Sequence, residues 1–346
     1  MGESTTWRYY GCVLLEATIY RSSGADMSRI EKVLCVIDPT ASAQPALQRA
    51  TWLSKQAGAE LDLLICYYNE FLSGHSVFDS RSLKKARAET IELHRQRLEK
   101  LAEPGRTLGL DVTTTAVWDH PLSEGIVRHV CSTGADIVFK DTHKHRTLGL
   151  TALSNTDWNL IRSCPVPLWL VKPHDFPTQP AVVAAIDPTN ENDKPAALDD
   201  EILQISKYIA EISGGDLHAF HSVDQVMAIE PLILGPYLPA SWTPSELEDQ
   251  IRVHHKSRFD EVVKRHDIAE DRAHLTAGYA HEQLPELATI LDAALVVMGA
   301  VARNRLRRIF VGSTAERTLE RLPCDLLIVK PEWFETPVHV ENQDAA

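Results

Sequence analysis

The residues best suited to chemistry lie in one segment, 299–314, which reads Gly-Ala-Val-Ala-Arg-Asn-Arg-Leu-Arg-Arg-Ile-Phe-Val-Gly-Ser-Thr. A helical pattern follows Gly312-Ser313-Thr314. Backbone amides at the N-terminus of a helix point at an anion, and the helix dipole favours its binding. Glycine allows the close backbone approach that this contact needs. The segment therefore predicts a phosphate site, to which Arg303 and the arginines at 305, 307 and 308 could add bidentate contacts.

Simpler interpretations of the same residues stay open. Glycine, serine and threonine are also ordinary N-cap residues. Four arginines in one short loop can also form a solvated charged surface. They are too few to predict nucleic-acid binding in a chain whose net charge is −13, because such binding needs a broad basic surface.

The sequence offers no nucleophile or general base for catalysis. It contains no Ser-His-Asp order, no Gly-x-Ser-x-Gly turn and no complete Walker loop. None of its histidine pairs has the four-ligand pattern of a closed metal site; these pairs are His143/His145, His218/His221 and His254/His255. We expect boundary histidines beside apolar stripes, no metal and no enzymatic activity.

The elements that must position the candidate site occur twice in the chain. The apolar run 32–38 closes with Asp-Pro-Thr, and the run 181–187 does the same 149 residues later. The run Leu-Trp-Leu-Val-Lys-Pro at 168–173 returns as Leu-Leu-Ile-Val-Lys-Pro at 326–331. A repeat of this length holds a whole domain, and 346 residues suit two domains. The chain is therefore predicted to be a fused pair of homologous domains.

The apolar runs lack alternation and are separated by amphipathic stretches, which indicates parallel strands buried on both faces. The predicted fold class is α/β, with two tandem Rossmann-like domains, each an open five-stranded parallel sheet with helices on both faces. Strands are expected near 32–38, 61–67, 111–118, 135–140, 167–172, 181–187, 216–221, 273–279, 294–299 and 325–330. Helices are expected near 43–57, 82–102, 122–133, 155–163, 194–213, 245–266, 284–292 and 313–321. A ligand should lie beyond the carboxyl ends of the strands, at the switch point where Asp38, Lys140, Asp187 and Gly299 fall.

The spacing Gly-x-x-Gly-x9-Gly-(Ser/Thr) after the fourth strand, with an aspartate ending the first, resembles the nucleotide-binding signature of tandem universal stress proteins. The resemblance runs over about 27–331 and includes Val-Trp-Asp-His-Pro at 117–121, Thr-Asp-Trp at 156–158 and the closing run 324–331. It implies two domains paired pseudo-symmetrically through their last strands. It also implies a cytoplasmic stress-response protein that supports survival under stress, including DNA-damaging stress.

The resemblance also implies which residues would bind a ligand. In the second domain they are Asp187, Gly299, Ala302, Arg303, Gly312, Ser313 and Thr314, with Ala302 standing where the family has glycine. The extra methyl group of Ala302 is expected to weaken or reshape the site. The first domain departs from the signature, with Lys140, His143 and Ser154-Asn155 at the equivalent places, so no nucleotide is expected there. ATP in the second domain is the candidate ligand, no other cofactor is expected, and Asp38 is expected to cap its own turn.

The predicted domain boundaries follow the two repeats. They are an extension at 1–26, disordered or preceding the true start at Met27; domain 1 at 27–173; a linker at 174–180; domain 2 at 181–331; and a flexible tail at 332–346. No apolar run reaches the ~18–20 residues that span a bilayer. The six cysteines are scattered without a Cys-x-x-Cys pair and are expected to be reduced in a cytoplasmic protein. The sequence leaves open a homodimer and a protein partner.

Two other functions also stay open. The segment 223–243 combines apolar residues with three prolines and could cover a cleft for an apolar, phosphate-bearing, lipid-like ligand, although packing on its own domain is the more ordinary role. A slow ATPase could use Asp187 near a metal-bound phosphate. Against it stand Ala302 and the lack of a general base.

Overall fold

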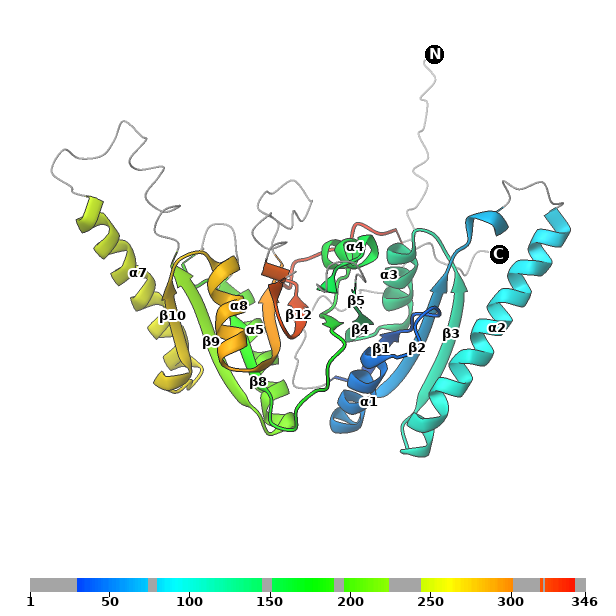
Figure 1. Ribbon diagram of the computed structural model, residues 1–346, viewed down its shortest axis with the longest axis horizontal. Helices are drawn as coiled ribbons and strands as arrows, with labels where there is room; N and C mark the ends of the chain where they lie inside the picture. The colour runs from blue at the N-terminus through cyan, green and yellow to red at the C-terminus, as the bar shows by residue number, and fades with distance from the viewer. Residues whose placement is uncertain are drawn as a thin grey trace, which may run out of the picture.

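The computed structural model describes residues 30–73, 80–144, 151–189, 196–223, 244–300, 318–319 and 321–339, which form two α/β halves side by side (Figure 1). The first half contains, in order, β1 (Lys32–Val36), α1 (Pro45–Ala57), β2 (Glu60–Tyr67), η1 (Glu70–Leu72), α2 (Ser80–Thr107), β3 (Val112–Trp118), α3 (Leu122–Thr133), β4 (Ile137–Asp141), β5 (His143–Lys144), β6 (Thr151–Ala152), α4 (Asn155–Ser163) and β7 (Leu168–Val171).

The second half repeats this order as far as the structure describes it. It contains β8 (Ala181–Ala185), α5 (Ala196–Ser213), β9 (Asp216–Val223), α7 (Pro244–Arg265), η2 (Glu270–Arg272), β10 (Ala273–Ala277), α8 (Ala280–Ile290), β11 (Ala293–Gly299) and β12 (Asp325–Val329).

One ten-stranded sheet runs through both halves in the order β10-β9-β8-β11-β12-β7-β4-β1-β2-β3. Within each half the neighbouring strands are parallel, and β1 or β8 lies between the second and fourth strands of its half. The halves meet where β12 pairs antiparallel with β7, with Leu327 opposite Trp169. This arrangement confirms the predicted fold class and the pairing through the last strands.

The core forms one layer on each face of the sheet, and both layers continue from one domain to the other. On one face α1, α2, α5 and α7 cover a cluster that includes Leu53, Leu98, Ile202 and Phe259. On the other face α3, α4 and α8 cover a cluster that includes Ile126, Leu160 and Leu284. Strands buried on both faces need apolar side chains at successive positions, which explains the unalternated runs in the sequence.

The expected elements lie within a few residues of those in the structure, and β5 and β6 form a small additional antiparallel pair. Of the predicted helix near 313–321, the described part is Thr318, Leu319 and Arg321, all helical. The extension 1–26 and most of 223–243 lie outside the described residues. The five cysteines that the structure describes are buried, and none of them forms a disulfide bond.

The linker and the start of the tail both pack on domain 1. Phe176 in the predicted linker lies between Trp52 and Trp169, with ring centroids 5.4 and 6.0 Å away. Thr336, in the predicted flexible tail, donates a 2.7 Å hydrogen bond from its hydroxyl to the carbonyl of Ser163. The described part of the tail, up to residue 339, therefore makes contacts that its acidic composition did not predict. Within the described ranges, the helices are all too short or too polar to cross a bilayer.

Candidate functional site

The predicted site of domain 2 lies at the carboxyl ends of β8 and β11. These strands are neighbours, with Ala185 opposite Met298, so Asp187 and Gly299 fall at the same edge of the sheet. Ala302, Arg303, Gly312, Ser313 and Thr314 lie outside the described residues. The described half of the site is therefore the Asp187 side, together with the end of β11.

Gly299 has a packing reason to be glycine. A Cβ atom at this position would lie 2.8 Å from Cδ2 of Leu198 and 3.3 Å from Cδ1 of Ile202, both on α5. The close approach of these α5 side chains to β11 thus favours glycine whether or not a ligand binds. The residue keeps its place in the signature, but its identity alone is not a sign of ligand binding.

Asp187 presents a carboxylate with room for a further partner. Its Oδ1 accepts a 3.0 Å hydrogen bond from the Thr189 hydroxyl, and 46% of its side chain is exposed. Its backbone amide donates to Oδ1 of Asp199 at 3.1 Å, which holds the turn after β8. The equivalent Asp38 accepts 2.7 Å hydrogen bonds from both the amide and the hydroxyl of Thr40. Asp38 caps its own turn, as the sequence predicted.

A histidine pair lies beside Asp187, and the sequence analysis did not link its members. His221 on β9 is buried, and its Nε2 lies 2.8 Å from Nδ1 of His255 on α7. Its Nδ1 lies 3.1 Å from the carbonyl oxygen of Ile186 and 4.0 Å from Oδ1 of Asp187. Because a carbonyl oxygen only accepts, Nδ1 of His221 carries the proton and its Nε2 accepts from Nδ1–H of His255. Nε2 of His255 is then left as a lone-pair acceptor.

Protonation of His255 should cost stability. Burial lowers the pKa of His255, and the neighbouring His221 lowers that pKa further. The ordinary pKa of histidine is about 6.5. If the pKa of a histidine is lower in the folded state than in the unfolded state, the protein becomes less stable as the pH falls below that value. We expect His255→Gln to make the free energy of unfolding less dependent on pH between about pH 5 and pH 8.

Urea unfolding at several pH values measures this effect. His254→Gln is the matched control, since His254 is the exposed neighbour on the same helix and is the weakest of the influences that lower the pKa of His255. It should change the pH dependence much less than His255→Gln does. If the free energy of unfolding of His255→Gln depends on pH as it does in the wild type, His255 is not the neutral, hydrogen-bonded imidazole assigned above.

The corresponding edge of domain 1 is filled by the chain itself. Lys140, at the end of β4, points its ammonium group at Asp157 of α4, with Nζ 2.6 Å from Oδ1. Oδ2 of Asp157 accepts from the amide and the hydroxyl of Ser154 at 2.7 and 2.8 Å, and Ser154 Oγ accepts from the amide of Asp157. This is a capping box at the N-terminus of α4. A carboxylate of the protein thus occupies the helix N-terminus where an anion would bind.

Asp141 adds a second buried carboxyl group at this edge. Burial raises its pKa to about 6, although its Oδ1 accepts a 2.7 Å hydrogen bond from the amide of Ala46 at the start of α1. Among the described residues, no group of three or more His, Cys, Asp or Glu side chains is arranged to hold a metal ion.

The comparison with known families decides the identity. A model described as the universal stress protein family matches residues 29–172 and again 181–330. The chain belongs to the universal stress protein family. The repeat found in the sequence thus corresponds to two complete universal stress protein domains.

Relatives of the same tandem length exist among universal stress proteins. Universal stress protein E of Escherichia coli K12 is 28% identical over 319 residues, covering 92% of this chain and 99% of that protein. A universal stress protein E homolog of Haemophilus influenzae is 26% identical, covering 88% and 98%. A solved protein of unknown function from Pseudomonas aeruginosa PAO1 shares the fold with a TM-score of 0.69 at 24% identity, covering 88% and 94%. A universal stress protein of Archaeoglobus fulgidus gives 0.59 at 16% identity, covering 86% and 98%.

Within this universal stress protein pair, the described residues of the two carboxyl edges differ in chemistry. Domain 1 presents an internally neutralised ion pair, whereas domain 2 presents a half-exposed carboxylate on Asp187 and an oriented imidazole on His255. A hydroxyl or amino group of a ligand could donate to either of these two acceptors. Sequence reasoning could have found His221 from its place at the end of a strand neighbouring β8, but His255 lies on a distant helix and gave no signal.

Proposed function

We propose that this universal stress protein supports survival under stress, including DNA-damaging stress, as a cytoplasmic, non-enzymatic protein whose second domain binds a nucleotide or a related anion. The observation that carries the proposal is the difference between the two edges. Asp157 and Lys140 neutralise each other in domain 1. Asp187 in domain 2 keeps 46% of its side chain exposed, next to the strand β11 that leads into the segment 299–314. Domain 1 then serves as a structural partner.

Mg-ATP is the probe for the second-domain site. Ligand that binds only the native state stabilises it by about 2.7 kcal/mol at 100 times its dissociation constant. We expect Mg-ATP to raise the thermal midpoint of the full chain. Gly312→Asp should abolish the rise because it places a negative charge against the phosphates, and Ala302→Gly should enlarge the rise because it removes the methyl group.

Asn155→Asp is the matched control, since it adds the same charge at the corresponding helix N-terminus of domain 1, where Asn155 is exposed. It should leave the Mg-ATP effect intact. An absent rise in the wild type and in Ala302→Gly would sink the nucleotide proposal and favour a lipid-like ligand or a protein partner. Release of phosphate that His255→Gln abolishes would instead favour the slow ATPase.

A further inference from the structure

The contacts between the two domains are of two kinds, and the first kind obeys the pseudo-symmetry of the pair. β7 and β12 pair about the Trp169–Leu327 position. Each Val-Lys-Pro motif sends its lysine across the boundary: Lys172 Nζ donates to the carbonyl of Leu322, and Lys330 Nζ donates to the carbonyl of Ile161 in the last turn of α4. Burial lowers the pKa of both ammonium groups. These contacts use a lysine present in both repeats and backbone carbonyls, so they do not by themselves distinguish one domain from the other.

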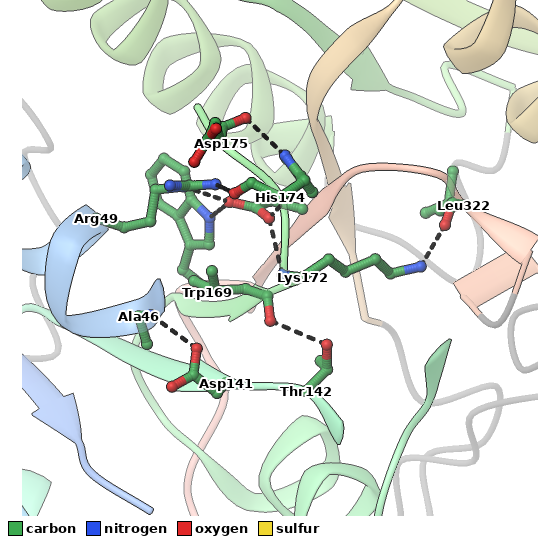
Figure 2. A network of polar contacts seen from close by, with 11 residues as sticks. Ala46, Arg49, Asp141, Thr142, Trp169, Lys172, His174, Asp175 and Leu322 are labelled. Carbon is green, nitrogen blue, oxygen red and sulfur yellow. Dashed lines mark hydrogen bonds and ion pairs between the residues drawn. The ribbon is translucent and has the colours of Figure 1, made fainter. Parts of the chain in front are cut away.

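The second kind of contact is asymmetric and centres on Asp325, the first residue of β12. Figure 2 labels four residues around it, Arg49, Trp169, Lys172 and His174. Asp325 is fully buried, and all its partners come from the first half or the linker. Its carboxylate accepts from Arg49 Nε at 3.0 Å, from the Trp169 indole at 3.0 Å and from the Lys172 amide at 2.9 Å. His174 Nε2 lies 3.0 Å from the same carboxylate, which raises the pKa of that imidazole.

The main partner of Asp325 is Arg49, which makes further contacts with the linker. Arg49 on α1 is itself buried, donates a 2.6 Å hydrogen bond from Nη2 to the carbonyl of His174, and lies over the Phe176 ring at 4.9 Å. One carboxylate of domain 2 thus neutralises a guanidinium of domain 1 inside the interface.

The pseudo-symmetric counterpart of this network contains none of these groups. By position in the closing strands, Asp325 corresponds to Pro167, Trp169 to Leu327 and His174 to Glu332. Since α1 ends at Ala57 and α5 at Ser213, Arg49 corresponds to Ile205. Ile205 and Leu327 are both fully buried. The buried network therefore exists once in the pair.

We propose that the Asp325 network makes pairing along the β7–β12 edge selective. Domain 1 then pairs with domain 2, and neither domain pairs with a copy of itself. Two copies of domain 2 would bury two Asp325 carboxylates beside the apolar side chains of Ile205 and Leu327, with no guanidinium. Two copies of domain 1 would bury two Arg49 side chains with no carboxylate. Removing the partner of a buried charge is strongly unfavourable, and such mismatches are an effective source of specificity.

Domain pairing in the cut full chain tests this selectivity. A protease site inserted after the exposed Thr178 allows the folded chain to be cut between its domains, unfolded in urea and refolded. Native mass spectrometry then counts mixed pairs and pairs of identical domains. With equal amounts of the two domains, random pairing gives a ratio of mixed pairs to pairs of identical domains of about 1, and we expect this ratio to be about 100 or more in the wild type.

Variants separate selectivity from general affinity. Arg49→Leu/Asp325→Leu should bring the pairs close to statistical proportions, because it removes both charges. Asp325→Asn keeps the size of the side chain and should lower the excess by at least about tenfold. The control Lys172→Met/Lys330→Met weakens reciprocal contacts and should leave the proportions unchanged. Statistical or absent mixed pairs in the wild type overturn the proposal, as does full selectivity in both Asp325 variants.

Discussion

Asp325→Ala is expected to lower the free energy of unfolding by about 3–5 kcal/mol, the usual cost of removing one partner of a buried ion pair. Asp325 is fully buried, and its loss leaves Nε of Arg49 and the Trp169 indole without their acceptor. A buried donor that loses its acceptor keeps its full desolvation cost. The effect should therefore exceed that of deleting an exposed ion pair, which is about 0–1 kcal/mol.

Urea unfolding followed by circular dichroism measures this loss. Asp249→Ala is the exposed control, because Asp249 is 68% exposed and pairs with Arg252 on the surface of α7. Arg49→Leu/Asp325→Leu should recover much of the stability, since replacing both charges by apolar groups is often neutral or stabilising. A loss below about 1 kcal/mol in Asp325→Ala would contradict the role of this carboxylate as the centre of the interface.

The sequence predicted the strands well because burial on both faces of a parallel sheet leaves a clear pattern. The run 32–38 reads as a strand from its own residues, and the repeat confirmed its partner at 181–187. The two aspartates that end these runs were placed at the carboxyl edge for the same reason. The structure agrees, with β1 and β8 in the same position of their halves.

The Asp325 network was beyond such reasoning, because Arg49 and Asp325 are separated by 276 residues. Periodicity shows that a side chain is buried, but it gives no partner for a charged one. A signal was nevertheless present. The residues before the lysine in the two closing runs are otherwise apolar in both repeats, but Asp325 stands opposite Pro167 in their alignment. A charge at the start of a buried strand in one repeat alone needs a buried partner.

For the carboxyl edge of the sheet in domain 1, the sequence predicted only that the nucleotide-binding signature is missing. Lys140, His143 and Ser154 showed that the signature was missing, but the residue that replaces the anion is Asp157, which resembled an ordinary first-turn acid of α4. Its role follows from the distance of 2.6 Å to Lys140, which depends on how β4 and α4 approach each other. Local sequence carries no such information.

Asp157→Ala should open this edge and is the second large effect that we expect. Asp157 is fully buried, so its removal leaves the buried Lys140 ammonium with the carbonyl of Asp141 at 3.1 Å, and α4 loses its capping box. The loss of a buried partner predicts about 3–5 kcal/mol lower stability in urea unfolding. Ser154→Ala removes the cap alone and should cost only about 1 kcal/mol.

Inorganic phosphate should restore part of the stability of Asp157→Ala, because the uncompensated Lys140 and the free N-terminus of α4 together form an anion site. At 100 times its dissociation constant the gain would be about 2.7 kcal/mol. The wild type and Lys140→Met/Asp157→Ala should show no such gain at the same ionic strength set with chloride. Equal effects of phosphate on all three proteins would mean that Asp157 does not occupy an anion site.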